Sequence, residues 1–449
     1  MGISLTFKRK QTMKKYFIFL ASAAMLFATS CAKEEVNTTG ETELITVQLN
    51  PETKTALGAE GTTTWDADDE VSVTVGGKVV GTLSLVEGST FSGELTTVGL
   101  TGPATLHYPA GVTAVPATQA AVENSFANGA ALLEGETTID ALRAGEGASL
   151  QNTTALLKFT PTIDGDVAFT VGTKTYTVED CKANKEYYAC VAPVAGKLSY
   201  TVGIVLGANE KADFTPVANT IYPLGTLALK ENDTYAVVGD YSNDGWNTDT
   251  MMYETTQDNL FVAHNITFTN KGNFKIRKAG VWDDAYNFGS ANSTTRSVNA
   301  TVGVFTHGSS ADINVNAATY DIYFNRLAGQ IYIMEPGKSY TEATKQTAPA
   351  NTYYSLIGTI EGSNWDKDFD LSYSGDGIWT IVQNFAAGTL WKIRENHDWT
   401  TSFNNVWVGW DLKTDSGSDL KMKAAGDYIV TYVEKNMNNE EDIITLAKK

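Results

Sequence analysis

Two nine-residue segments that share the residues K-I-R and a final tryptophan hold the side chains of this chain that are best suited to binding a ligand. Phe274–Trp282 begins with the letters FKIR and ends in tryptophan, and Trp391–Trp399 begins with WKIR and also ends in tryptophan. Their arginines, Arg277 and Arg394, lie 117 positions apart. A duplicated segment that keeps its cations and its tryptophan in register indicates two copies of one module with a shared task.

An earlier pair of tryptophans repeats at almost the same distance. Trp246 and Trp365 are 119 positions apart, and each follows the end of an apolar segment by several residues. An indole ring offers an apolar face to the C–H groups of a pyranose, while lysine and arginine donate charge-assisted hydrogen bonds to its hydroxyls. The combination predicts a carbohydrate-binding site in each module.

The FKIR and WKIR segments are predicted β-strands, whose side chains alternate between two faces. Phe274 and Ile276 should face the core, whereas Lys275 and Arg277 should face the other way, with Trp282 folded over them. An asparagine follows each tryptophan by five residues. The predicted carbohydrate-binding residues are therefore Lys275, Arg277, Trp282, Asn287, Lys392, Arg394, Trp399, Asn404, Trp246 and Trp365. The alternative is structural, with the tryptophans in the core and the cations at solvated strand positions.

The elements that must position these residues are predicted to be strands. Short apolar runs or period-two alternation mark, among others, Ile45–Leu49, Val71–Val75, Ala155–Phe159, Gln330–Met334 and Tyr428–Val433. Only Ala117–Leu133 and Ile139–Arg143 are compatible with short helices. The fold class is therefore all-β, a chain of tandem β-sandwich domains, and the N-terminal sequence described below predicts that this chain is lipid-anchored.

Composition divides the chain into segments, because eight of the nine tryptophans lie after residue 240. The expected organisation is a signal peptide (1–30), a lipidated tether (31–40), one or two β-sandwiches (41–230), a first module (234–336), a polar linker (341–351) and a second module (352–447).

The N-terminus has the features of a bacterial export signal. Lys14 and Lys15 precede an apolar stretch that is too short to span a membrane, and the stretch leads through small residues to Cys31. The pattern resembles a lipoprotein box, with Ala28 in place of the usual leucine, so Cys31 is the expected lipidation site. The following Lys33-Glu34-Glu35 resembles the surface-export signal of Bacteroidota lipoproteins, which implies an outer-membrane anchor facing the cell exterior. The alternatives are an ordinary signal peptide and a simple charged tether.

The charge of the chain restricts its partners. After residue 30, 28 basic and 52 acidic residues remain, a net formal charge of −24. This charge argues against nucleic acid and anionic lipid, is compatible with a neutral polysaccharide, and disfavours a polyanionic glycan unless a local basic patch prevails.

The remaining reactive side chains indicate no chemistry. Cys181 and Cys190 flank a polar stretch typical of a hairpin tip, and either a disulfide between them or two buried thiols is expected. The four histidines lack metal-ligand spacing, and the zinc, hydrolase and P-loop signatures are missing from the sequence. We expect no enzymatic activity, no metal and no cofactor, although composition alone does not exclude a carboxylate pair of the glycosidase type.

The front half resembles fimbrillin-like surface lipoproteins of Bacteroidota. The likeness lies in Thr53–Leu57 leading to Thr64–Asp69, then His107–Pro109, Val115–Gln119 and Ala155–Phe159, in that order. It implies an architecture rather than an activity.

Residues 230–447 resemble the glycan-binding domains of the SusE/SusF outer-membrane lipoproteins, through the strand, tryptophan and asparagine pattern given above. The second module departs by having Trp391 as its first aromatic residue and a longer spacing from Asn404 to Gly409. The resemblance implies binding of starch or another α-glucan without catalysis, for an uptake system with a TonB-dependent outer-membrane porin as the expected partner. The competing interpretations are a fimbrial accessory or adhesin whose C-terminal modules bind protein and, less favoured, a glycosidase.

Overall fold

The structure is a computed structural model of the 449-residue chain. It describes residues 40–52, 65, 67–123, 130–308, 310–403, 412–414, 419–435 and 442–449. The predicted signal peptide, Cys31 and Asn404 lie outside these residues. Within them, strands dominate and the predicted all-β class is confirmed. No helix in these ranges is long and apolar enough to cross a bilayer.

The first unit is a closed barrel. Its strands are β1 (Glu43–Glu52), β2 (Glu70–Val75), β3 (Lys78–Glu87), β4 (Thr90–Leu95), β5 (Pro103–Tyr108), β7 (Leu133–Thr138) and β8 (Ala148–Asn152). The barrel closes because β1 is long enough to pair twice, antiparallel with β4 through Ile45 and parallel with β8 from Leu49 onward. The front of the chain was expected to contain only sandwiches, and this ring of strands corrects that expectation.

The second unit is built from two sheets. The larger contains β6 (Thr118–Ala120), β10 (Gly165–Val171), β11 (Lys174–Cys181), β13 (Gly196–Val202), β14 (Val205–Leu206) and β15 (Lys211–Phe214). The smaller contains β9 (Ala155–Thr160), β12 (Tyr187–Val191) and β16 (Thr220–Thr226). Phe159 and Phe169 meet between the sheets with ring centroids 4.9 Å apart, so this unit has the predicted two-layer core.

Two local predictions for the front half have different outcomes. The short helix α1 (Ile139–Arg143) forms where expected, because the Thr138 hydroxyl accepts a hydrogen bond from the Ala141 amide and Ile139 and Leu142 are buried. The Cys181–Cys190 segment is not a hairpin, since β11 and β12 belong to different sheets. Both cysteines are buried and neither forms a disulfide. Burial raises the pKa of each thiol to about 12, so both stay protonated.

The first module contains one sheet of eleven strands that folds over on itself. It consists of β17 (Glu231–Gly239), β18 (Thr250–Glu254), β19 (Leu260–Phe268), β20 (Gly272–Lys278), β21 (Asn287–Gly289), β22 (Thr295–Arg296), β23 (Ala300–Gly303), β24 (Phe305–Thr306), β25 (Ile313–Val315), β26 (Ala318–Asn325) and β27 (Gln330–Met334). Phe274 of β20 and Ile333 of β27, from opposite parts of the sheet, lie in one buried cluster. The folded sheet therefore encloses a core as a sandwich does.

The second module has two separate sheets. One contains β28 (Tyr354–Gly358), β29 (Phe369–Asp370), β32 (Leu390–Glu395), β33 (Ser402–Phe403), β34 (Leu412–Thr414) and β35 (Leu420–Met422). The other contains β30 (Ser372–Gly375), β31 (Ile378–Phe385), β36 (Gly426–Val433) and β37 (Ile443–Lys448). Strand β28 pairs with β32 as β17 pairs with β20, so both modules present the lysine and arginine of the repeated segment on corresponding strands.

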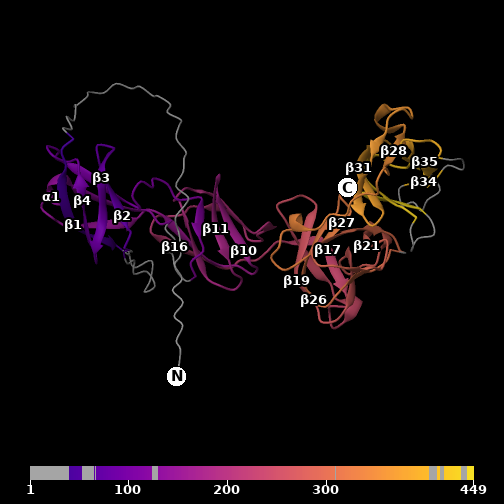
Figure 1. The fold of residues 1–449 in the computed structure, drawn as a ribbon, viewed down its shortest axis with the longest axis horizontal. Helices are drawn as coiled ribbons and strands as arrows, with labels where there is room; N and C mark the ends of the chain where they lie inside the picture. Colours follow the sequence, from indigo (N-terminus) through magenta and orange to yellow (C-terminus); the bar gives the residue numbers. More distant parts are fainter. Residues whose placement is uncertain are drawn as a thin grey trace.

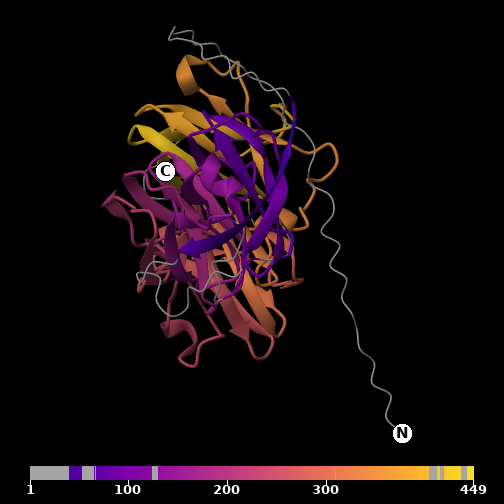
Figure 2. The same cartoon turned by 90° about the vertical axis from the view of Figure 1, so that its left-hand side faces the viewer.

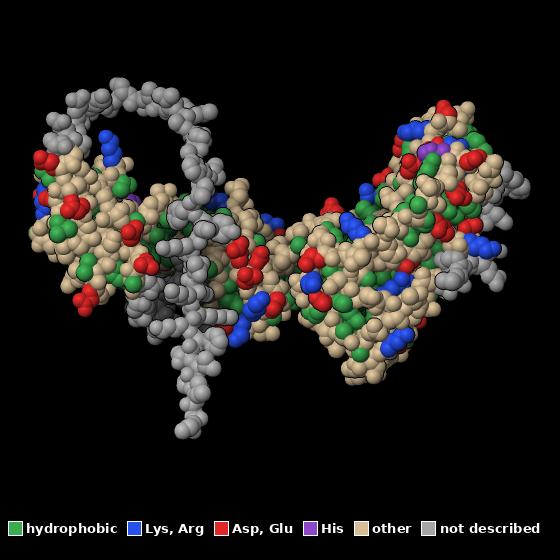
Figure 3. Space-filling model, viewed as in Figure 1, with side chains coloured by type: hydrophobic (Ala, Val, Ile, Leu, Met, Phe, Trp, Pro, Cys, Tyr) green, Lys and Arg blue, Asp and Glu red, His purple; other side chains and the backbone are tan. Residues whose placement is uncertain are grey.

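The four units follow one another along an elongated molecule (Figure 1), and a view from the barrel end shows them behind one another (Figure 2). The second unit and the first module share a buried apolar cluster, in which Val205 and Leu229 join Val262 and Met334. Acidic side chains occur on every unit of the face drawn in Figure 3, in keeping with the acidic composition.

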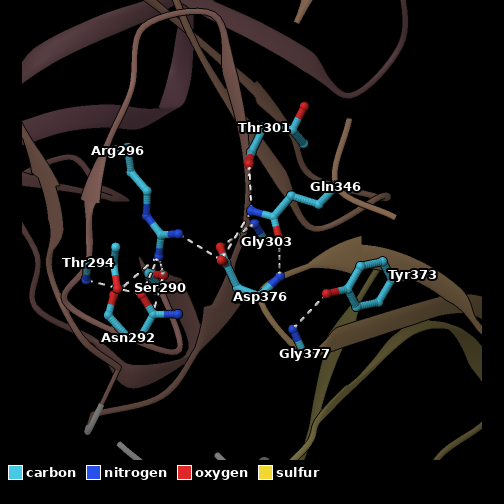
Figure 4. A network of polar contacts seen from close by, with 10 residues as sticks. All are labelled: Ser290, Asn292, Thr294, Arg296, Thr301, Gly303, Gln346, Tyr373, Asp376 and Gly377. Carbon is cyan, nitrogen blue, oxygen red and sulfur yellow. Dashed lines mark hydrogen bonds and ion pairs between the residues drawn. The ribbon is translucent and has the colours of Figure 1, made fainter. Parts of the chain in front are cut away.

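The two modules are joined through a polar network (Figure 4). Arg296 of the first module pairs with Asp376 of the second at 2.7 Å, and both side chains are nearly buried. The second carboxylate oxygen of Asp376 accepts a hydrogen bond from the Gly303 amide. Gln346, in the predicted linker, bonds to Thr301 and Asp376. The linker is therefore part of the interface between the modules.

Candidate functional site

The first module holds its arginine on the face of β20 away from the core, as the alternation predicts. Phe274 and Ile276 are fully buried, and Arg277 points the other way, beneath the loops that follow β17 and β20. Its Nε donates to Asp249 Oδ1 at 2.8 Å. The guanidinium carbon lies 4.4 Å from the ring centroid of Trp282, a cation–π contact.

A second indole completes this arrangement. The ring centroids of Trp246 and Trp282 are 6.0 Å apart at an interplanar angle of 43°. Trp246 lies in the short 3₁₀ turn η2 (Gly245–Asn247) and Trp282 in the loop after β20. We call Trp246, Trp282, Arg277 and Asp249 the first indole shelf.

The second module repeats these four side chains. Arg394 pairs with Asp368, its guanidinium carbon lies 4.8 Å from the centroid of Trp399, and Trp365 lies 6.1 Å from Trp399 at 44°. We call Trp365, Trp399, Arg394 and Asp368 the second indole shelf. The near identity of the distances shows that the duplication preserved a three-dimensional arrangement.

The shelves face solvent. Trp282 and Trp399 are each 51% exposed, and Trp246 and Trp365 are partly exposed. The structural alternative, with tryptophans in the sandwich cores, is therefore wrong for these four residues. Trp379 and Trp391, by contrast, are buried core residues.

The cations differ from the solvated strand positions that one alternative predicted. Arg277 is 4% and Arg394 is 8% exposed, because the indoles and carboxylates cover them. Such nearly buried cations require partners, since an unpaired buried charge is costly. The aspartates pair with the arginines, and the rings of Trp282 and Trp399 lie against the paired guanidinium groups.

The lysines of the two segments serve a different purpose. Lys275 is buried, and its Nζ donates to the carbonyl and hydroxyl oxygens of Ser310 at 2.9 and 3.2 Å, with Asp312 at 3.7 Å. Burial lowers the pKa of Lys275 despite the nearby carboxylate. Lys392 Nζ lies 3.1 Å from Asp419. Both ammonium groups are engaged by protein acceptors, so they are weaker candidates for ligand contacts than the arginines.

The arginines retain unused donors. Among the described residues, Arg277 makes a hydrogen bond through Nε only, which leaves both Nη groups for a ligand. Arg394 donates through Nε and Nη2 to Asp368, which leaves Nη1. Burial raises the pKa of Asp368, but hydrogen bonds from Arg394 and Ser355 outweigh it and lower the pKa below its usual range.

Asp249 and Asp368 were missed in the sequence. Each follows its tryptophan by three residues, Trp246 and Trp365 respectively, and the two aspartates are 119 positions apart, as the tryptophans are. The repeated W-x-x-D spacing was a signal that could have identified them. This signal is weak, because acidic residues are common throughout this chain.

The asparagines are placed unequally. Asn287 lies opposite Arg277 in the β20–β21 pair, so it shares the face of the arginine. Its Oδ1 is buried and has no hydrogen-bond partner within the described residues. In the second module the position opposite Arg394 belongs to Ser402, and Asn404 lies outside the described residues. Strand register therefore matches Asn287 with Ser402.

The described residues contain no cluster of three or more His, Cys, Asp or Glu side chains that could hold a metal ion. The site thus consists of aromatic faces and fixed hydrogen-bond donors. Such a surface is suited to binding a polar, ring-containing ligand.

No protein-family model matches the sequence, and no curated protein matches it. Among solved structures, the chain is similar to SusF from Bacteroides thetaiotaomicron at 16% identity and a TM-score of 0.20, covering 66% of this chain and 76% of that one. It is also similar to a candidate cell adhesion protein from Bacteroides uniformis ATCC 8492, at 11% identity and a TM-score of 0.24, covering 48% of this chain and 99% of that one. At these scores the likeness carries no argument about function, which rests on the site.

Proposed function

We propose that this chain is a non-catalytic, cell-surface polysaccharide-binding lipoprotein that captures starch or another α-glucan for an outer-membrane uptake system. The observation that carries the proposal is the duplicated, solvent-facing pair of indoles resting on a paired arginine.

The geometry is suited to a pyranose. A sugar ring laid on an indole gains about 1–2 kcal/mol from partial burial of its C–H face. The tilt of 43–44° between the rings of each pair forms a shallow angle that can follow two successive sugars. The free Nη groups of Arg277 and Arg394 then donate to hydroxyls at the edge of the platform.

Two sites on one chain raise the avidity for a polymer. Once one shelf has bound, the other meets the same polysaccharide at a high effective concentration. The Arg296–Asp376 interface supports this arrangement, because it limits the relative movement of the modules.

The location and partners are also part of the proposal. Lipidation at Cys31 and export to the outer face of the outer membrane rest on the N-terminal sequence pattern. A TonB-dependent porin is the proposed recipient of the captured glycan.

The test uses the chain from Ala32 onward in gels that contain amylopectin. We expect retarded migration, and loss of the retardation when Trp282→Ala is combined with Trp399→Ala. Val79→Ala with Val86→Ala, two exposed residues of the barrel, is the matched control and should leave migration unchanged. No retardation on a panel of neutral polysaccharides would overturn the proposal.

The fimbrial or adhesin alternative requires exchange of a terminal strand or a protein-binding face. Strand β37 is already paired with β36 from Ile443 to Lys448 in its own sheet. This pairing gives the alternative no support.

A further inference from the structure

A groove lies beyond the first indole shelf, where the two modules meet. It has a volume of about 270 Å³. The loop that follows Trp282 supplies Asp283 and Tyr286, strand β21 supplies Phe288, and the other wall comes from Arg326 and Lys448. The groove thus begins at the residue next to the exposed indole.

Two cations, Arg326 and Lys448, line this groove, and a third, Lys278, lies against one of its lining residues. Lys278 Nζ lies 5.3 Å from the ring centroid of Tyr286. Arg326 lies over Tyr235 and donates through Nη2 to the backbone carbonyl of Lys448, which places the Arg326 and Lys448 residues side by side. Tyr286, Arg326 and Lys448 all line the groove.

None of these three cations has a carboxylate partner among the described residues. Within the described part of the chain, no ion pair joins Lys278, Arg326 or Lys448 to an acidic residue, whereas Lys230, Lys338 and Arg143 are all paired. Asp283 also lines the groove and contributes one negative charge, fewer than the three positive charges of Lys278, Arg326 and Lys448. In a chain with a formal net charge of −19, the groove is therefore a local concentration of unpaired positive charge.

We propose that this groove binds an anionic substituent, a carboxylate or a sulfate group, on the glycan held by the first indole shelf. The inference rests on the proposed glycan binding and adds to its ligands polysaccharides that carry anionic substituents. Guanidinium and ammonium groups bind such oxygens through charge-assisted hydrogen bonds, and the Tyr286 ring supplies a face for the sugar that carries them.

The overall negative charge does not oppose this assignment. Charges farther away than about 8 Å are largely screened at physiological ionic strength, so the groups in contact with the ligand dominate. The preference for an anionic ligand should therefore depend on salt in a way that stacking on the indoles does not.

Binding is measured by calorimetry on the chain from Ala32 onward. The ligands are tetragalacturonate for the carboxylate, a sulfated carrageenan tetrasaccharide for the sulfate, and maltotetraose as the neutral reference. We expect one of the anionic ligands to bind about tenfold more tightly than maltotetraose at low salt, with the advantage shrinking at about 0.15 M salt.

The variants separate the groove from the shelf. Lys278→Gln with Lys448→Gln changes two exposed side chains and should weaken anionic binding about tenfold while leaving maltotetraose binding unchanged. Lys174→Gln with Lys271→Gln makes the same change in charge at exposed positions elsewhere and should have no effect. Arg326→Gln tests the third cation.

The outcomes distinguish the two proposals. If maltotetraose binds and Trp282→Ala combined with Trp399→Ala removes that binding, but neither anionic ligand is preferred, the glycan-binding proposal stands and the groove assignment is overturned. Anionic binding that is unchanged in the double lysine variant also overturns the assignment. If no ligand binds, both proposals fail.

Discussion

The two indole shelves contain the same four residue types at nearly the same distances, yet they use their aspartates differently. One carboxylate oxygen of Asp249 accepts a hydrogen bond from Arg277. The other accepts one, at 2.6 Å, from the amide of Gly280, in the loop that carries Trp282. Both carboxylate oxygens of Asp368 accept hydrogen bonds from Arg394, and one of them also accepts a hydrogen bond from the Ser355 hydroxyl at 2.7 Å. The first aspartate therefore fastens a loop, and the second fastens its arginine to the sheet.

This difference divides the modules by role. Arg277 keeps two nitrogens for a ligand, whereas Arg394 keeps one, so the first shelf should contribute more specific hydrogen bonds. The more strongly paired second shelf should be more rigid and should contribute mainly stacking. Duplication thus preserved a surface while its hydrogen bonds diverged.

The largest expected effect comes from breaking the ion pair that joins the two modules. Asp376→Ala leaves Arg296 nearly buried without its partner and should destabilise the interface by about 3–5 kcal/mol. We expect the modules to unfold in two calorimetric transitions instead of one. Asp366→Ala, an exposed aspartate of the second module, is the control, and an equal effect there would contradict the role of the interface.

The next largest effect is the loss of module stability when one of the two shelf aspartates is replaced by asparagine. Asp368→Asn should destabilise the second module by about 3 kcal/mol, because Arg394 loses a two-point charge pair in a site that is largely shielded from solvent. Asp249→Asn should cost the first module less, since only one bond to the arginine is lost. Hydrogen exchange in β32 and β20 measures the two effects.

Asp370→Asn provides the control for that comparison, because this aspartate is exposed and its ion pair, within the described residues, is with the exposed His397. Similar exchange rates in the Asp249 and Asp368 variants would show that the different pairing has no energetic consequence.

A smaller effect concerns ligand affinity. Trp282→Ala should weaken glycan binding by about tenfold, and Trp399→Ala by a smaller factor, because the stacked sugar at the first shelf also orients its hydroxyls toward two free arginine nitrogens. Calorimetry with maltotetraose measures the difference. A larger loss in the Trp399 variant would reverse the assigned roles.

The smallest effect is a pH dependence confined to the second module. The pKa of Asp368 is lower in the folded chain than its ordinary value of 3.8, so the unfolded chain binds the proton more readily. The stability that Asp368 contributes is complete above pH 3.8 and is lost as the pH falls through the pKa of the folded chain. Exchange in β32 should show this loss, and Asp368→Asn should abolish it; a variant that keeps the pH dependence would contradict the mechanism.

Local patterns predicted much of the fold. The segment Gln330–Met334 coincides with β27, and Ile139–Arg143 is α1, because both depend on side chains within a few residues of each other. The closure of the barrel was not predictable in this way, since it requires β1 to pair with two strands that lie far away in the sequence.

The sequence by itself determined that two modules carry tryptophans and arginines in register, and alternation along FKIR and WKIR determined which face the arginines occupy. The tertiary structure alone decided that Arg277 and Arg394 are covered while Trp282 and Trp399 stay open, because that outcome depends on loops folding over the strands. It also decided that Arg326 and Lys448 line one groove and that Lys278 lies against its Tyr286. Burial and charge pairing are properties of distances in space, and residues separated by 170 positions have no local pattern that reveals them.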